Sequence, residues 1–314
     1  MKNIKFVQIL SVVALLTFSV FSCSNNEYHF EYEAHPQTEL GKKLVANSSL
    51  VASIHKDSAY VLAEGVTATE IHYLSDKGLS QHAFFFEVDL TNPALSIEVA
   101  TPNGDPHKFA MQEMSEQATY ANREGHRVLG GVNADFYNMK NGVPRGILYH
   151  KGEAIKESIQ EVTGRPSGFF VITKDKKALV GDMSQYDELK SKYEFEEAVG
   201  ASNILVNKGE VLPQLDESIH PRTCIGISKD STTIYIMAID GRNFHYSNGM
   251  TLEELGRALQ AIGADQATNL DGGGSTTFII PAAEENKFQV RNWPTDNGGI
   301  ERKVANGLVI ISNK

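Results

Sequence analysis

The chain has 314 residues and a formal net charge of −10. Hydrophobic residues make up 41% of it and charged residues 22%, which is the composition of an ordinary globular protein with a sizeable core. Its acidic balance and the absence of a basic stretch in the sequence argue against a nucleic-acid partner.

The N-terminus has the pattern of a secretory signal. Two lysines precede an apolar run from Phe6 to Phe21, and the run ends in Val-Phe-Ser-Cys23, which resembles a bacterial lipobox. We expect cleavage before Cys23, so that residues 1–22 are a lipoprotein signal peptide. A lipid on Cys23 would then hold the protein at the cell envelope, on the periplasmic or cell-surface side, and would be its membrane contact. The alternative is a plain cleaved signal in which Cys23 is incidental.

Residues 23–80 are expected to form a tether followed by a segment of helical and loop character, and residues 81–314 a single main catalytic domain. If Cys23 carries a lipid, Cys224 has no disulfide partner. It lies in an apolar run, which predicts a small buried hydrophobic side chain rather than a nucleophile.

Strand patterns dominate from His82 onward. The apolar spacing of residues 111–121 predicts a helix, and the acidic stretch 182–197 favours a solvated helix or loop. Strands are predicted at 83–90, 95–99, 128–132, 146–149, 168–173, 204–206 and 210–212.

The last third has the strongest pattern. Residues 223–228 and 233–239 indicate an antiparallel pair, and further strands are expected up to Leu270 and at 277–280 and 304–312. Between them, Thr251 with Glu254 forms a capping box that opens a helix, and Gly263 ends it. Because short turns join most strands, we expect an α+β fold with a mixed, largely antiparallel sheet and packed helices.

The most informative segment is Asn269-Leu-Asp-Gly-Gly-Gly-Ser-Thr276. Three consecutive glycines allow close approach and positive φ angles, and successive N–H groups in such a turn can converge on an oxyanion. Asp271 is therefore a candidate acid or base. The amides of Gly272, Gly273 and Gly274, with the hydroxyls of Ser275 and Thr276, are candidate anion contacts. A tight glycine-rich loop without a ligand is the alternative.

Three other clusters follow predicted strand ends, where a rigid sheet can present reactive groups. Asn133 and Asp135 come first, with Arg145 shortly after. Next come Arg222 and Thr223, and then Asp240 and Arg242. An arginine can bind a phosphate or a carboxylate through two parallel hydrogen bonds. An Asx turn, a surface ion pair and a tight turn, respectively, are the alternative interpretations of these clusters.

The ordered set of motifs resembles the phosphodiester glycosidase family, the domain of N-acetylglucosamine-1-phosphodiester α-N-acetylglucosaminidase (the "uncovering enzyme") and its bacterial relatives. The set is Asn-Ala-Asp-Phe-Tyr, Arg-Thr, Asp-Gly-Arg, Gly-Met-Thr-Leu, Asn-Leu-Asp-Gly-Gly-Gly-Ser-Thr and a late Arg302 with Asn306-Gly307. The resemblance covers about residues 81–314, and the chain would be a bacterial lipoprotein member. It lacks the cysteines expected of a luminal animal enzyme, so that enzyme's disulfides do not carry over.

The resemblance implies a hydrolase that cleaves sugar-1-phosphate diesters at the anomeric C–O bond. Its substrate would be a phosphorylated glycan or sugar phosphodiester. Asp271 and Asp135 would be the carboxylates at the reacting carbon, and Asp240 would position Arg242 or be a third acid. Arg222, Arg242 and the glycine amides would hold the phosphate. The substrate would be oriented by Asn133, Arg145, Ser275, Thr276 and Arg302.

No cofactor or metal is expected to be required. Three aspartates could instead gather a divalent ion, which would make the chain a metal-dependent phosphodiesterase that breaks a P–O bond. A surface lipoprotein that binds anionic glycans without turnover is the third interpretation.

Overall fold

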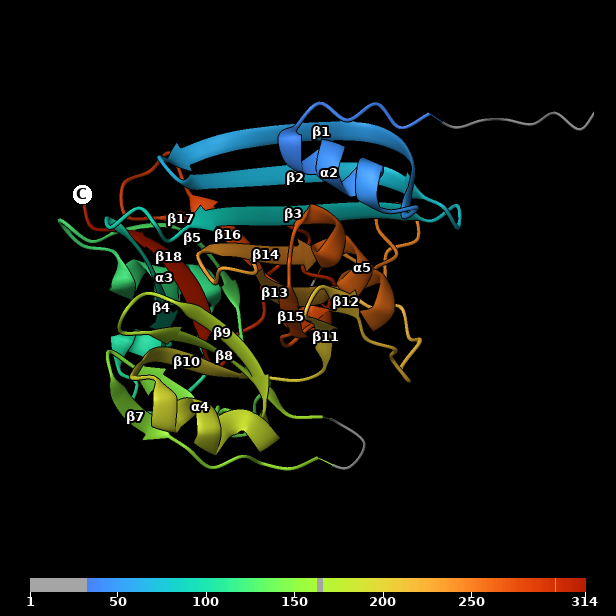
Figure 1. Cartoon of the computed structure of the whole chain (residues 1–314). Coiled ribbons are helices and arrows are strands. Elements are labelled where there is room, and N and C mark those ends of the chain that lie inside the picture. Colours follow the sequence, from blue (N-terminus) through green and yellow to red (C-terminus); the bar gives the residue numbers. More distant parts are fainter. Residues whose placement is uncertain (1–32, 163–165, 297) are drawn as a thin grey trace, which may run out of the picture. The chain divides into compact units, whose positions relative to one another are not determined.

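The fold is known from a computed structural model that describes residues 33–162, 166–296 and 298–314 (Figure 1). Residues 34–314 form one compact unit. The predicted signal and Cys23 lie outside the described residues, so lipid attachment stays a prediction. No helix in the described part of the chain has the length and apolar character needed to cross a membrane.

An eight-stranded sheet is the largest element, in the order β1-β2-β3-β14-β13-β15-β11-β12. Every pair of neighbours in it is antiparallel. In that order the strands are β1 (Val51–Ala63), β2 (Val66–Ser75), β3 (Ser80–Asp89), β14 (Thr233–Ile239), β13 (Arg222–Ile227), β15 (Gln266–Asn269), β11 (Ile204–Asn207) and β12 (Glu210–Val211).

Two five-stranded sheets, also antiparallel throughout, complete the strands. One is β7 (Glu153–Lys156), β6 (Leu148–His150), β10 (Phe195–Ala201), β8 (Gly168–Thr173) and β9 (Ala178–Asp182). The other is β17 (Phe288–Val290), β16 (Phe278–Pro281), β5 (Arg127–Asn133), β18 (Gly307–Ser312) and β4 (Leu95–Ala100). The α+β, largely antiparallel fold predicted from the sequence is confirmed.

The described α-helices are α2 (Glu39–Asn47), α3 (Met114–Ala121), α4 (Tyr186–Lys192) and α5 (Leu252–Ile262), with 3₁₀ turns η1 (Pro102–Gly104), η2 (Met183–Gln185) and η3 (Gly273–Ser275). The predicted boundaries of α5 are confirmed. Thr251 and Glu254 form the capping box, and Gly263 follows the last turn with a φ of 119°. That angle lies in the left-handed region, which glycine adopts without strain.

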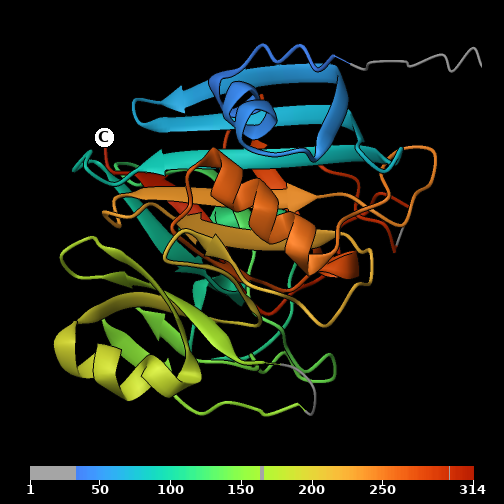
Figure 2. The same ribbon diagram turned by 45° about the vertical axis from the view of Figure 1, so that its right-hand side comes forward.

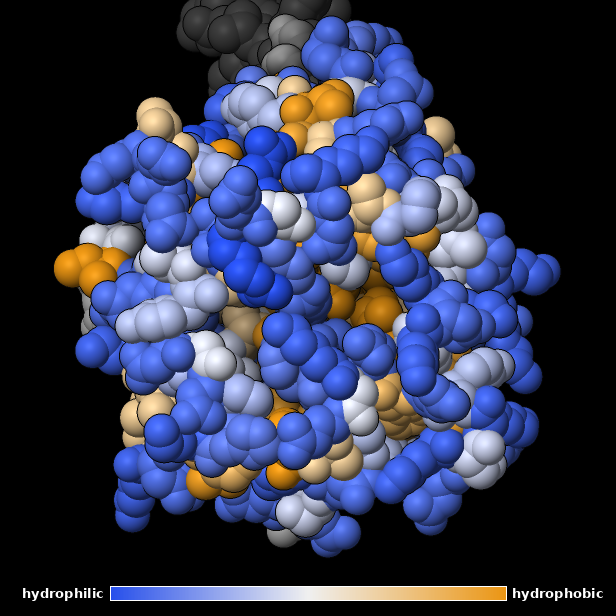
Figure 3. All heavy atoms as spheres, turned by 90° about the vertical axis from the view of Figure 1, so that its left-hand side faces the viewer, coloured by the Kyte–Doolittle hydropathy of each residue, from blue (hydrophilic) through white to orange (hydrophobic). Residues whose placement is uncertain are grey.

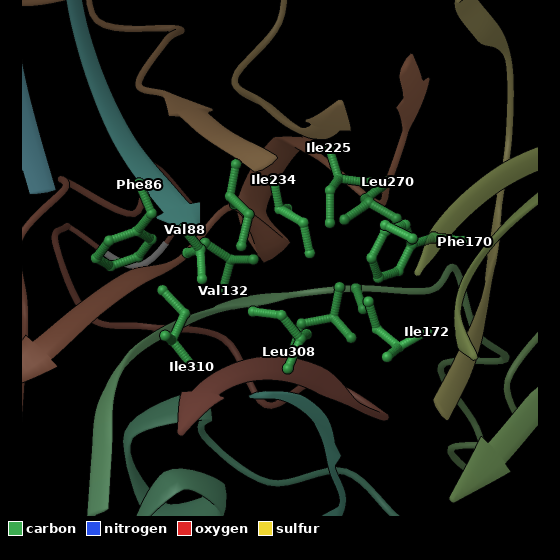
Figure 4. Close-up of a cluster of buried hydrophobic side chains, with 14 of the residues drawn as sticks. Phe86, Val88, Val132, Phe170, Ile172, Ile225, Ile234, Leu270, Leu308 and Ile310 are labelled. Atoms are coloured by element: carbon green, nitrogen blue, oxygen red, sulfur yellow. The ribbon is translucent and has the colours of Figure 1, made fainter. Parts of the chain in front are cut away.

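The central core lies between the three sheets (Figure 4). Because side chains alternate across a strand, Phe84 and Phe86 of β3 point into this core and Phe85 points to the opposite face. Val132, Phe170 and Leu308 bring the two smaller sheets to the same cluster.

The other face of the large sheet is covered by α2 and α5, which contact each other (Figures 1 and 2). Cys224 of β13 is buried in this second core, as its apolar surroundings predicted. Helices α3 and α4 each cover one of the smaller sheets with a cluster of their own. The face drawn in Figure 3 is mostly hydrophilic, with apolar side chains in small groups.

The predicted domain organisation needs correction at its N-terminal boundary. Only α2 has the helical character expected before residue 80, because β1 and β2 are long strands paired with each other and with β3. They belong to the compact unit, which therefore starts near residue 34 rather than 81. β1 is an edge strand, and none of its residues is buried, so it has a weak apolar pattern. A second correction concerns the end of the acidic stretch 182–197, which was expected to be a solvated helix or loop. Residues 195–197 instead open strand β10.

Candidate active site

Antiparallel pairing brings three of the sequence clusters to the same end of three neighbouring strands, β13, β14 and β15, of the large sheet. Arg222 at the start of β13 pairs with Ile239 at the end of β14, and Cys224 pairs with Asn269 at the end of β15. Asp240 follows the first of these strand ends directly, and Asp271 follows the second after Leu270. Residues far apart in the chain therefore leave the sheet side by side.

The fourth cluster reaches the same place from the end of β5. The Asp271 N–H donates to the Ala134 carbonyl at 2.8 Å, and the Asn133 Nδ2 donates to the Asp271 carbonyl at 2.6 Å. Leu270 is part of the central core, which anchors the chain beside Asp271 (Figure 4). The loops that carry Asp135 and Asp271 are thus bonded to each other.

Asn133 and Thr223 hold these loops together from behind. The Thr223 hydroxyl and the Thr277 N–H both donate to Asn133 Oδ1, at 2.8 and 3.0 Å. Asn133 is 1% exposed and Thr223 is fully buried. Asn133 therefore positions the backbone of Asp271 and Thr277, and Thr223 orients the Asn133 side chain, which corrects the substrate contacts expected from the sequence.

A pocket of about 330 Å³ opens in front of Asp271, which is the one acid among its described lining residues. The lining is Phe136, Tyr137, Asn138, Met139, Arg145, Gln160, Val162, Asp271, Ser275 and Arg302. Arg302, which precedes β18, donates from Nη1 to Ser275 Oγ at 3.3 Å. The pocket thus brings together one carboxylate, two guanidinium groups and the hydroxyls of Tyr137 and Ser275.

Arg145 lines this pocket and also supports its wall. Its Nε donates to the Gln160 carbonyl and its Nη2 to the Ser167 hydroxyl, both at 3.0 Å. The side chain is 5% exposed, so it stabilises the loop that follows β7 while its charge stays at the pocket.

The expected cradle of glycine amides is wrong for two of the three glycines. The Gly272 N–H donates to Asp271 Oδ1 at 3.0 Å, and the Gly273 N–H donates to the Pro221 carbonyl at 2.8 Å. Glycine is required here for its backbone freedom and its small size. Gly273 has a φ of 63°, and a Cβ on Gly272 would lie 2.7 Å from the Pro221 oxygen. The Thr276 side chain is buried and does not line the pocket. Its hydroxyl has no hydrogen-bond partner among the described residues.

Arg222 lies against the glycine turn, but it is not among the residues that line the pocket of Asp271. Nη2 donates to the Ser218 carbonyl at 2.7 Å and Nε to the Met250 carbonyl at 3.3 Å. It lines a neighbouring pocket of about 810 Å³ beside Asp216 and His220. The predicted contact of Arg222 with a phosphate next to Asp271 is therefore corrected.

Asp240 does not position Arg242. Its buried carboxylate accepts hydrogen bonds from Asn292 Nδ2 at 2.9 Å and from the Trp293 N–H at 2.8 Å. Burial raises the pKa of Asp240 to about 6. Arg242 instead turns toward Gly273 and pairs with Asp296 across 3.3 Å.

Asp135 is 2% exposed and sits beside Asp271 rather than in the pocket lining. Its Oδ2 accepts a hydrogen bond from the Gly146 N–H at 2.7 Å, while Oδ1 has no partner among the described residues. Burial raises the pKa of Asp135 to about 7, against the lowering effects of that hydrogen bond and of Lys156. The negative charge of Asp271 raises it further.

Sequence reasoning missed three residues here. Tyr137 lines the pocket and donates to the Lys303 carbonyl at 2.8 Å. The Lys156 ammonium donates to the Gly146 carbonyl at 2.9 Å, close to Asp135. Asp296 pairs with both Arg242 and Arg302. Tyr137 stood within a quoted motif, whereas Lys156 and Asp296 carry no local signal.

A sequence profile of the phosphodiester glycosidases matches residues 126–311, more than half of the chain. The chain belongs to the phosphodiester glycosidase family. Membership confirms the resemblance carried by the motifs and identifies the chain at family level as a hydrolase of glycosyl phosphodiesters. A comparison with curated proteins gives no match.

Solved structures share the fold of this phosphodiester glycosidase. The catalytic domain of zebrafish N-acetylglucosamine-1-phosphodiester α-N-acetylglucosaminidase, auto-inhibited by its pro-peptide, matches with a TM-score of 0.60 and 20% identity over 82% of this chain and 88% of that one. A hypothetical protein from Synechocystis matches with a TM-score of 0.52 and 14% identity, over 82% and 64%. An exported protein from Burkholderia pseudomallei matches with a TM-score of 0.50 and 13% identity, over 74% of each chain.

No group of three or more histidine, cysteine, aspartate or glutamate side chains is arranged to hold a metal ion within residues 33–162, 166–296 and 298–314. Whether catalysis by this phosphodiester glycosidase needs a divalent ion is a question for chelation, and the expectation of no metal stays a prediction.

Proposed function

We propose that this phosphodiester glycosidase hydrolyses sugar-1-phosphate diesters, such as GlcNAc-1-phosphodiesters, at the bond between the anomeric carbon and the phosphate oxygen. The products are the free sugar and a phosphomonoester. One observation carries the proposal: Asp271 is the one acid lining a pocket whose other charged groups are Arg145 and Arg302, within the described residues. A carboxylate for the sugar carbon and cations for the phosphate are the groups that this reaction requires.

Charge explains why this arrangement suits a phosphodiester. When the C1–O bond breaks, the electron pair stays on the phosphate oxygen, and the leaving group departs as a stabilised anion. Strong general-acid assistance is therefore less necessary than for an ordinary glycoside. Asp271 acts either as the nucleophile at C1 or as the base that takes a proton from the attacking water. Arg302 stabilises the charge that develops on the phosphate.

Asp135 is proposed as a positioning residue for Asp271. Two interacting carboxylates do not both ionise easily, and burial places the proton on Asp135, the less exposed of the two. A neutral Asp135 leaves the negative charge on Asp271, which faces the pocket. The assignment of separate roles to two neighbouring acids follows from their different surroundings.

Asp271→Asn tests the proposal directly. The substitution is nearly isosteric and keeps an oxygen that can accept from the Gly272 N–H, so the fold should be preserved. We expect kcat/KM for a GlcNAc-1-phosphodiester to fall by about 10³-fold or more, since the reacting group is lost. The matched control is Asp216→Asn, an acid of the neighbouring pocket, which should change kcat/KM by less than about threefold.

Full activity of Asp271→Asn would remove that residue from the mechanism, and loss of wild-type activity in chelator would favour the metal-dependent alternative. If the wild type releases no sugar from any glycosyl-1-phosphodiester, the non-catalytic glycan-binding interpretation holds instead.

We also propose that the protein works at the cell envelope, held by a lipid on Cys23. The support is the lipobox-like sequence at the end of the predicted signal. The wild type should incorporate a labelled fatty acid that Cys23→Ser does not, and equal labelling of the two proteins, or none in the wild type, would contradict the anchor.

A further inference from the structure

We propose that the substrate's phosphate binds between Arg242 and Arg302, in a site that the carboxylate of Asp296 fills in the free protein. Asp296 is then an internal competitor for the anion site. The inference rests on the proposed function, which identifies the ligand as a phosphate oxyanion. It adds Asp296 as a residue that controls access to the phosphate site.

The contacts of Asp296 are those expected of a bound anion. Its Oδ1 lies 3.3 Å from Arg242 Nη1, and its Oδ2 pairs with Arg302 Nη2. Arg302 also donates to the Ser275 hydroxyl, which lines the pocket beside Asp271. Two guanidinium groups from distant parts of the chain therefore converge on one carboxylate at the edge of the candidate active site.

The glycine turn is shaped around this carboxylate. A Cβ on Gly274 would collide with Asp296 Oδ2 and with Arg302 Nη2, and a Cβ on Gly273 would lie 3.1 Å from Arg242 Nη2. Glycine at both positions leaves room for an oxyanion and two guanidinium groups against the main chain. The need for this space explains the triple glycine. Its N–H groups do not explain it, because those of Gly272 and Gly273 are bonded within the protein.

Asp296 can leave the site without disturbing the core. Its side chain is 31% exposed, and Arg242 and Arg302 are 41% and 26% exposed. The preceding residues, Asn292 and Trp293, are held by the buried carboxylate of Asp240. The anchor fixes where the segment starts, and the exposed carboxylate beyond it can be exchanged for a ligand.

The phosphodiester substrate carries one negative charge on two non-bridging oxygens, as the Asp296 carboxylate does, so it can replace that carboxylate on the two arginines, and the phosphomonoester product carries up to two charges. The phosphomonoester product binds the same arginines, so return of Asp296 would assist its release. The structure thus assigns Asp296 the role of a group that is displaced when substrate enters and competes when product leaves.

Calorimetric titration with inorganic phosphate tests the inference without turnover. Asp296→Asn keeps the shape of the side chain and removes its charge, so the variant should bind phosphate at least about fivefold more tightly than the wild type. Asp216→Asn is the matched control, because it also removes one negative charge beside an arginine, Arg222, in the adjoining pocket. Its affinity for phosphate should stay within about twofold of the wild type.

Unchanged or weaker phosphate binding by Asp296→Asn would overturn the inference, since it would make Asp296 a clasp that merely holds the arginines. An equal gain in Asp216→Asn would also overturn it, as a general charge effect. Arg302→Gln should weaken binding by about tenfold or more, and circular dichroism should show both Asp296→Asn and Arg302→Gln folded. Because the readout is binding, it can succeed even if no glycosyl phosphodiester is cleaved, and it can fail while cleavage is observed.

Discussion

Asp135 keeps one carboxylate oxygen without a partner among the described residues, while the other accepts from the Gly146 N–H. Gly146 and Gly200 pack so closely against it that neither leaves space for a larger side chain. A buried carboxyl of this kind is neutral over a wider pH range than a solvated one. Its protonation is therefore linked to the stability of the protein.

The sign of that linkage is fixed by the raised pKa. With a pKa of about 7 in the folded protein against about 3.9 in the unfolded chain, the native state keeps a proton that the unfolded state has released. This contribution to stability is present below about pH 4 and is lost as the pH rises toward 7. Asp135→Asn cannot lose it, because its side chain is neutral throughout.

We predict that the free energy of unfolding of Asp135→Asn, relative to the wild type, rises by about 2 kcal/mol between pH 5 and pH 7.5. Denaturant unfolding of both proteins at several pH values measures this difference. Asp240 has a raised pKa in both proteins, so its titration cancels. A difference that does not vary with pH would mean that Asp135 is ionised in the folded state.

At the scale of elements, local signals decided what the sequence could predict. Helix α5 was placed correctly because Thr251, Glu254 and Gly263 define both its ends within the segment itself. Strand β1 was missed although it forms a hairpin with β2, because none of its residues is buried and its side chains show no clear alternation of apolar and polar faces. The glycine turn was located, but not the partners of its amides, because the Pro221 carbonyl that binds Gly273 comes from a distant strand end.

The N-terminal elements make a prediction about the size of the folded unit. Helix α2 buries Leu40 and Leu44, and strand β2 buries Ile71 and Tyr73. Burial of a large apolar side chain contributes about 1.5–3 kcal/mol, so the four together are comparable with the whole stability of a typical domain. A chain that starts at residue 81 would also leave the edge of β3 unpaired.

We therefore expect a protein of residues 81–314 to be unfolded or aggregated, and a protein of residues 34–314 to unfold cooperatively at a defined temperature. Size-exclusion chromatography and thermal unfolding measure both. Cooperative unfolding of the shorter protein near that temperature would restore the boundary at 81.

At the scale of the whole molecule, the candidate site exists because strands from two sheets end at one place. The sequence indicated which segments carry polar groups after strands, and their order carried the family resemblance that the profile match confirms. It could not indicate which way each side chain turns. Arg222 lies at the strand end where the sequence predicted it. Its guanidinium nevertheless belongs to the neighbouring pocket, because it donates hydrogen bonds to the Ser218 and Met250 carbonyls.

The central claim concerns which bond of the phosphodiester breaks, and hydrolysis in ¹⁸O-labelled water measures it. The products are analysed by mass spectrometry of the phosphomonoester and, at early times, of the sugar. If Asp271 promotes attack on the anomeric carbon, the label enters the sugar hydroxyl and the phosphomonoester stays unlabelled. Label in the phosphomonoester would show P–O cleavage and would contradict the account.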